Sequence, residues 1–113
     1  MNSFSSDGSP IDVAHLDRMT LGDARLQNEI LILFSAQAAA LISDLAASPP
    51  DAAGLAHKLK GSARAIGAFG VAAAVDDLEH AIRERIDPSE ALRALKIAVA
   101  RAREAIDAML RRP

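Results

Sequence analysis

From Asp51 to Gly67 the chain reads DAAGLAHKLKGSARAIG, and this stretch decides the fold. Its leucines, its isoleucine and several of its alanines recur every three or four positions, which is the spacing of one face of an α-helix. Asp is a common residue at helix N-termini, and Gly is the residue that most often follows a helix C-terminus. The stretch therefore predicts an amphipathic helix over residues 52–66. Its apolar face consists of Ala52, Leu55, Leu59, Ala63 and Ile66.

Similar apolar stripes lie on both sides of this helix. They predict a long helix that ends at Ser48-Pro49-Pro50, a helix over residues 71–82, and a last helix that begins at Asp87-Pro88-Ser89-Glu90. Thr20 followed by Asp23 resembles a capping box at the start of the long helix. The stripe residues are Leu26, Ile30, Phe34, Ala38, Leu41 and Leu45 in the first of these helices, Val71, Val75, Leu78 and Ile82 in the second, and Leu92, Leu95, Val99, Ala102, Ile106 and Leu110 in the third.

The N-terminal residues differ in composition. Residues 1–10, MNSFSSDGSP, are rich in Ser, Gly and Pro and predict a mobile lead-in. Pro10 is expected to open a short helix over residues 11–17. Four amphipathic helices with short connections pack most simply as neighbours of opposite direction. We therefore predict an all-α fold, an antiparallel up-down four-helix bundle over residues 11–113 with a short extra N-terminal helix at one end.

Composition narrows the class of protein. The chain has 113 residues, half of them apolar and a quarter charged, with a net charge of −2, which fits one soluble globular domain. The absence of Cys excludes disulfides and thiolate sites and fits a reducing cytoplasm. With no Trp or Tyr there is no platform for stacked bases, and the longest uncharged run, between Glu29 and Asp44, is shorter than the roughly 20 residues that span a membrane. We expect a cytoplasmic monomer that binds neither nucleic acid nor a membrane.

His57 is the most informative side chain. It lies two residues from both Leu55 and Leu59, and at about 100° per residue this places it on the outward face of its helix. Glycine inside a helix costs about 1 kcal/mol relative to Ala, so the small residues beside His57 suggest that another molecule must approach it closely. Its neighbours one or two turns away are Ala53, Gly54, Lys60, Gly61 and Arg64.

An exposed imidazole is a competent nucleophile near neutral pH, and its Nε2 atom lies farther from the backbone than Nδ1. Lys60 and Arg64 can complement the negative charge of a phosphoryl group. Residues 51–70 carry three basic side chains against one acid, Asp51, in a chain that is acidic overall. From geometry alone, however, an ordinary surface histidine beside ordinary surface cations remains an equal alternative.

The segment around His57 resembles the signature of the histidine phosphotransfer (HPt) domain. The family pattern is His, any residue, Leu, Lys, Gly and Ser, with a Gly-Ala pair a few residues later. Phe34 and Leu78-Glu79 also resemble family positions. The resemblance extends over about residues 11–112. One departure is Ala63, which replaces a second Ser found in many members. The matching residues are His57, Leu59, Lys60, Gly61, Ser62, Gly67 and Ala68.

This resemblance implies a phosphorelay intermediate without ATP site or kinase activity. Such a module accepts a phosphoryl group from the aspartate of one receiver domain and passes it to another, and the Mg²⁺ for this chemistry belongs to the receiver, so no cofactor or metal site is expected in this chain. The resemblance assigns the carrier to His57, its charge partner to Lys60 and steric clearance to Gly61. We expect receiver domains of response regulators or hybrid kinases to contact Ala53, Gly54, Lys58 and Arg64.

Other classes of protein remain alternatives. A helical adaptor would use the same bundle without phosphorylation, and the phosphoacceptor domain of a chemotaxis-type kinase shares both bundle and histidine motif. The sequence argues against an enzyme, because no acid lies three or four positions from His57 to orient it as a base. We interpret Asp76, Asp77 and Glu79 as the solvated face of their helix, and His15 and His80 as surface or boundary residues.

Overall fold

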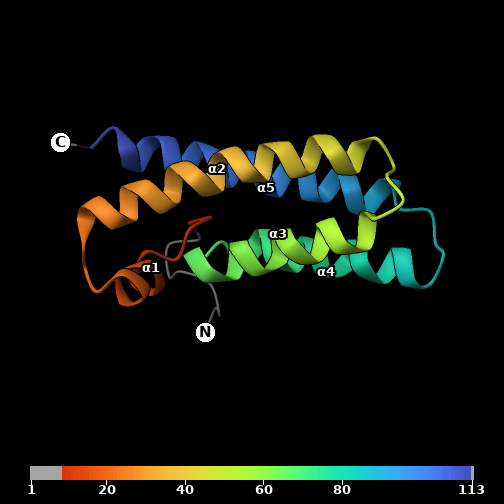
Figure 1. Cartoon of the computed structure of the whole chain (residues 1–113), viewed down its shortest axis with the longest axis horizontal. Helices are drawn as coiled ribbons and strands as arrows, with labels where there is room; N and C mark the ends of the chain where they lie inside the picture. Colours follow the sequence, from red (N-terminus) through yellow and green to blue (C-terminus); the bar gives the residue numbers. More distant parts are fainter. Residues whose placement is uncertain (1–8, 113) are drawn as a thin grey trace.

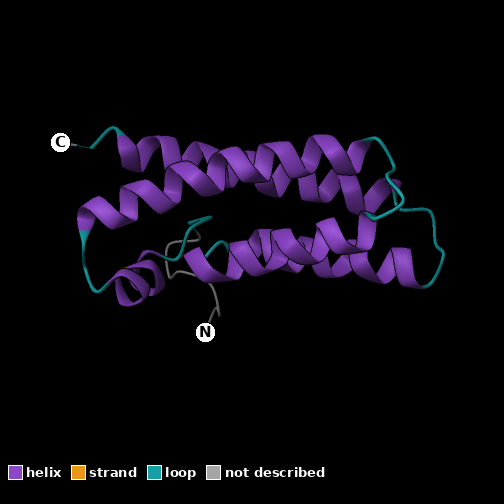
Figure 2. Ribbon diagram, viewed as in Figure 1, coloured by secondary structure: helices purple, strands orange, loops and turns teal. Residues whose placement is uncertain are grey.

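The structure, a computed structural model, describes residues 9–112, and within them the chain forms five helices and no strand (Figure 2). Figure 1 shows α2 and α5 in one layer and α3 and α4 in the other, with successive helices running in opposite directions. The predicted all-α, antiparallel up-down four-helix bundle with an extra N-terminal helix is confirmed. The helices are α1 (Val13–Thr20), α2 (Ala24–Ala46), α3 (Ala52–Ile66), α4 (Phe69–Arg83) and α5 (Ser89–Leu110).

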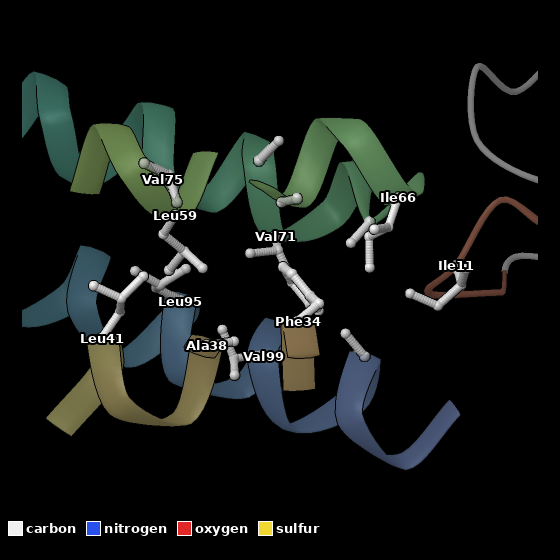
Figure 3. Close-up of a cluster of buried hydrophobic side chains, with 14 of the residues drawn as sticks. Ile11, Phe34, Ala38, Leu41, Leu59, Ile66, Val71, Val75, Leu95 and Val99 are labelled. Atoms are coloured by element: carbon white, nitrogen blue, oxygen red, sulfur yellow. The ribbon is translucent and has the colours of Figure 1, made fainter. Parts of the chain in front are cut away.

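The hydrophobic core lies between the two layers. Figure 3 shows Leu59 and Val71 of the α3–α4 layer pointing toward Phe34 of α2 and Leu95 of α5. Each of these side chains is at most 3% exposed. The predicted apolar stripes therefore supply the core, and burial of their side chains provides the main favourable term in folding.

The connection between α3 and α4 is very short. Gly67 adopts a left-handed conformation with φ of 86°, which ends α3 without the steric penalty that a side chain would bring. The next residue, Ala68, donates its N–H to Ala63 O at 2.8 Å, which is the hydrogen bond typical of a glycine-terminated helix. Gly67 is also the docking point for the N-terminal segment, because its carbonyl accepts the N–H of Asp12 at 2.9 Å.

The N-terminal region differs in detail from the prediction. Residues 1–8 of the expected lead-in lie outside the described residues, whereas Ser9 and Pro10 are half-buried. The short helix begins at Val13 rather than at residue 11, because Asp12 is its cap and accepts the N–H of His15. It runs on to Thr20 and packs against α2 and α3 at one end of the bundle.

The expected capping box of Thr20 and Asp23 is wrong. Thr20 is the last residue of α1 and donates its hydroxyl hydrogen to Leu16 O within that helix. Asp23 alone caps α2, and its carboxylate accepts the N–H of Leu26. The two residues belong to different helices, and the turn between them is closed by a hydrogen bond from Asp23 N to Thr20 O.

The ends of two other helices also differ slightly. Leu26, expected in the core, is 41% exposed, because it lies in the first turn of α2, which extends past the end of α3 (Figure 1). Leu31 is buried instead. Helix α5 begins at Ser89, one residue after Pro88, and the carboxylate of Asp87 accepts both the N–H and the hydroxyl of Ser89, which lowers the pKa of Asp87.

Among the described residues, α2 is the one helix that is long and apolar enough to cross a membrane, with a mean hydropathy of 1.6. Length and composition alone do not distinguish such a segment from the core helix of a soluble bundle. In this structure the helix contributes five buried side chains, and its exposed face carries no charge between Glu29 and Asp44. The buried residues are Leu31, Phe34, Ala38, Leu41 and Leu45. The length criterion of the sequence prediction therefore does not exclude a membrane span for α2, of whose apolar window 28% is buried, and its role as a core helix rests on these five side chains.

The glycine that follows α3 and the glycine inside it predict opposite effects of substitution by alanine. A Cβ at Gly67 would lie 2.8 Å from Asp12 O and would occupy a left-handed conformation, so Gly67→Ala is expected to lower the free energy of unfolding by about 2–3 kcal/mol. At Gly61 a Cβ meets nothing within 4 Å, so Gly61→Ala is expected to raise it by up to about 1 kcal/mol. Urea unfolding followed by circular dichroism measures both, and equal stability of the two variants would contradict this account of the turn.

Candidate functional site

Small side chains bring α3 and α4 close together. Ala56 and Ala63 are buried one turn before and one turn after Lys60 on α3, and Ala72 is buried one turn before Asp76 on α4. Because Lys60 contacts Asp76 across the two helices, this spacing places the three alanines on the facing sides of α3 and α4. The distance between packed helices depends on the size of the side chains at the contact, so alanines allow a close approach. Side chains on the outer edge of α3 can therefore reach side chains on the outer edge of α4.

His57 lies on this outer edge, on the solvent side. Its side chain is 77% exposed, which agrees with its predicted position opposite the core. Its Nδ1 atom lies 3.6 Å from Oε2 of Glu79 on α4, which is close enough for an ion pair but longer than a hydrogen bond. A carboxylate beside Nδ1 favours a proton on that nitrogen, and in the neutral ring this leaves the lone pair on Nε2.

Lys60 lies one turn after His57 and is held by two carboxylates of α4. Its ammonium donates hydrogen bonds to Glu79 Oε1 and, at 3.1 Å, to Asp76 Oδ1. The hydrogen bonds to Glu79 and Asp76 raise the pKa of Lys60 above its ordinary value, so the side chain is charged throughout the physiological range. Its side chain is 15% exposed, compared with 52% for Asp76.

Glu79 connects these two contacts. One of its carboxylate oxygens faces His57 and the other accepts from Lys60, and its side chain is only 18% exposed. Our interpretation of Glu79 as part of a solvated helix face is therefore wrong, whereas Asp76 and Asp77 are exposed as expected. The carboxylate that can orient His57 comes from the neighbouring helix rather than from its own.

The other predicted partner-binding residues surround His57 on the surface. Ala53, Gly54, Lys58 and Arg64 are all exposed. Gly61 is exposed as well, and the space beside its Cα is open. Within residues 9–112 neither Lys58 nor Arg64 forms an ion pair, so both cations are available to an anionic partner. Lys60 differs from them, because its charge is already paired.

Gly54 has a second explanation besides clearance. It lies in the first turn of α3 rather than in the helix interior. A Cβ at this position would lie 2.5 Å from one carboxylate oxygen of Asp51, so the glycine leaves room for that side chain. Asp51 is the residue that precedes α3, but its side chain makes no capping hydrogen bond. Clearance for an approaching partner therefore explains Gly61 better than Gly54.

The remaining histidines lie elsewhere. His15 of α1 is half-buried with its ring edge against Phe69, at a centroid distance of 5.1 Å, and His80 is exposed beside Arg83. Over residues 9–112 no three His, Asp or Glu side chains are grouped in a way that could hold a metal ion. The chemistry that the site itself offers is that of an accessible nucleophilic nitrogen beside a carboxylate and a paired ammonium.

Leu78-Glu79 was noted as resembling a family position, but the contact of Glu79 with His57 was missed because the two residues lie 22 positions apart in the sequence. The available signal was the short Gly67-Ala68 connection, which requires α3 and α4 to be adjacent and antiparallel. In such a pair the residues that face the outer edge of α3 meet residues that share one edge of α4. Asp76 and Glu79, three positions apart, share an edge in this way.

Comparison with known proteins identifies the family of the chain. No curated protein and no solved structure matches the chain significantly. The family model of the Hpt domain matches residues 29–110, which include most of α2 and all of α3, α4 and the residues of α5 up to Leu110. The matched region contains His57, Lys60, Gly61 and the two carboxylates of α4. The chain therefore belongs to the Hpt domain family, whose members are soluble helical bundles that transfer phosphoryl groups through a histidine in phosphorelays.

Proposed function

We propose that this chain carries a phosphoryl group on Nε2 of His57 between the aspartates of receiver domains in a multistep phosphorelay. The observation that carries the proposal is the exposed His57 ring with the Glu79 carboxylate 3.6 Å from Nδ1. This arrangement leaves the second ring nitrogen, Nε2, facing away from Glu79 and open to a partner. The chain acts as a carrier and, in this proposal, has no kinase activity of its own.

The transfer step requires little of the chain beyond this nitrogen. The Nε2 lone pair attacks the phosphorus of an aspartyl phosphate, the P–N bond forms, and the P–O bond breaks with its electron pair on the departing carboxylate. The proton on Nδ1 stays in place, and Glu79 stabilises the positive charge that develops on the ring. Reversal of the same step on a second receiver returns His57 to its starting state.

The receiver is expected to dock over α3 and the adjoining edge of α2. Gly61, Ala53 and Gly54 provide a low surface next to His57, and Lys58 and Arg64 complement the acidic site of a receiver. On α2, Ser35 accepts a hydrogen bond from Arg103 of α5, so Leu33, two residues earlier, lies on the opposite edge toward α3. Leu33 is 68% exposed and offers an apolar contact beside the histidine face.

Partners and location follow from this role. We propose that the partners are receiver domains of response regulators or hybrid histidine kinases, that the Mg²⁺ lies in the receiver, and that the chain needs no cofactor. A cytoplasmic monomer is the simplest form of such a carrier. The adaptor alternative would leave His57 unphosphorylated, so the first experiment below separates it from the carrier.

His57→Gln is expected to abolish phosphoryl acceptance from a phosphorylated receiver domain. Because the His57 side chain is largely exposed, its replacement should change the free energy of unfolding by no more than about 0.5 kcal/mol. Transfer is measured as acid-labile, base-stable phosphate on the chain. Retained phosphorylation would move the site to another residue, and loss of helical circular dichroism would show that His57 is structural.

Glu79→Ala is expected to change the protonation of the neutral His57 ring. We expect the Glu79 carboxylate, 3.6 Å from Nδ1, to favour the proton on that nitrogen. Without it the ring should shift toward the Nε2-protonated form, and phosphoryl acceptance should slow. Nitrogen-15 chemical shifts of the ring distinguish the two forms directly. The same Nδ1-protonated ring in both proteins would remove the role that we give to Glu79. Glu84→Ala, at the exposed residue that follows α4, serves as the control.

Gly61→Gln tests steric clearance beside His57 without disturbing the fold. The new side chain would point into open space one turn from His57, so the fold should tolerate it. It would also obstruct an approaching receiver, and displacement of the reacting atoms by even 1 Å can cost about 100-fold in rate. We expect a loss of about that size in the rate of phosphotransfer, with a much smaller loss for Gly61→Ala. Transfer at the wild-type rate by Gly61→Gln would refute the clearance argument.

A further inference from the structure

The ion cluster beside His57 contains more negative than positive charge. Lys60 supplies one ammonium, and it hydrogen-bonds two carboxylates, those of Glu79 and Asp76. Glu79 also faces His57, whereas within residues 9–112 the one ion pair of Asp76 is with Lys60. Asp76 therefore has no role in orienting the imidazole, and its effect on the site passes through the lysine.

Phosphorylation of His57 would bring a third anion to the same cation. His57 and Lys60 are three positions apart on α3, a spacing at which side chains on a helix surface are neighbours. A phosphoryl group on Nε2 and the carboxylates of α4 would then compete for one ammonium. An ammonium that is already paired with two carboxylates stabilises a new anion less than one that is paired with a single carboxylate.

We infer that Asp76 is a positioning residue that restrains Lys60 and thereby limits how firmly the chain holds the phosphoryl group. This inference rests on the proposed function of His57 as the carrier. A carrier must release the group to a second receiver as readily as it accepted it from the first. Asp76 serves this requirement by keeping the phosphorylated state from becoming too stable.

Asp76 is expected to affect the equilibrium of phosphoryl transfer between His57 and a receiver aspartate, which is one reversible step. In the forward direction the P–N bond to Nε2 breaks, its electron pair stays on Nε2, and a P–O bond forms to the receiver aspartate. The equilibrium ratio of phosphorylated chain to phosphorylated receiver measures the relative stability of the two states. Unlike a rate, this ratio does not depend on how well the receiver docks.

The experiment compares this ratio for the wild-type chain and Asp76→Asn. A receiver domain is phosphorylated with acetyl phosphate, excess reagent is removed, and the chain is added until the distribution no longer changes. Phosphorylated and unphosphorylated forms are then separated on a phosphate-affinity gel. With Asp76 neutralised, Lys60 is freer to pair with the phosphoryl group, and we expect the ratio to shift toward phosphorylated His57 by up to about fivefold, the range of an exposed ion pair.

Two further variants test the route through Lys60. Asp77→Asn removes the same charge from the next position of α4, on the side that forms a groove with α5, and should leave the ratio unchanged. In a Lys60→Met background, Asp76→Asn should have no effect, because the cation for which the anions compete is gone. A similar shift with Asp77→Asn, or a persistent shift in the Lys60→Met background, would overturn the inference in favour of a general charge effect.

The outcomes also separate this inference from the proposed function. If the wild-type chain exchanges phosphoryl groups with none of the receiver domains encoded alongside it, the proposed function fails and takes the inference with it. If the wild-type chain exchanges and Asp76→Asn leaves the ratio unchanged or shifts it toward the receiver, only the role of Asp76 fails. A shift toward phosphorylated His57 that requires Lys60 supports both.

Discussion

The close, alanine-lined contact between α3 and α4 is the constraint on which the rest of the site depends. The buried Ala56, Ala63 and Ala72 share the helix faces of Lys60 and Asp76, which meet across this contact, and the left-handed Gly67 joins the two helices through a short turn. Larger side chains at the contact would separate the helix axes, and carboxylates on α4 would then lie beyond the reach of His57 and Lys60. The packing between α3 and α4 therefore determines which side chains can interact with His57 and Lys60 at the surface.

The site itself combines an exposed nucleophile with a covered ion cluster. His57 is in solvent, where another protein can reach it, whereas Lys60 and Glu79 are mostly shielded between the two helices. Partial shielding strengthens their mutual attraction and holds both side chains in one geometry. Glu79 can then present a fixed charge to His57, which a fully exposed and freely rotating carboxylate could not do.

Much of the fold follows from the sequence because helical periodicity is local. The spacing of Leu59, Ala63 and Ile66 defines a buried face, and the same spacing places His57 on the opposite side. Periodicity also placed Gly61 on the exposed side of its helix, and in the structure the space beside its Cα is open. These features depend only on the geometry of a single helix.

The features that the sequence did not reveal depend on how two helices pack against each other. The pairing of Lys60 with Glu79 and Asp76 requires the register between α3 and α4, which no periodicity of either helix contains. The exposure of Leu26 likewise depends on where α2 begins relative to the end of α3. Thr20 was assigned to the wrong helix because residues of this type indicate that a helix boundary is near but not on which side of it they lie.

The short α3–α4 turn also determines where the length of the chain can vary. An extra residue between Gly67 and Asp76 would rotate the rest of α4 by about 100° and move it along its axis by about 1.5 Å, which would take both carboxylates away from α3. The loops between α2 and α3 and between α4 and α5 lie together at the other end of the bundle (Figure 1), and neither sets the register of α3 against α4. Insertions and deletions among descendants of this sequence should therefore accumulate at residues 47–51 and 84–88, where a reporter or an affinity tag could also be introduced without changing the geometry around His57.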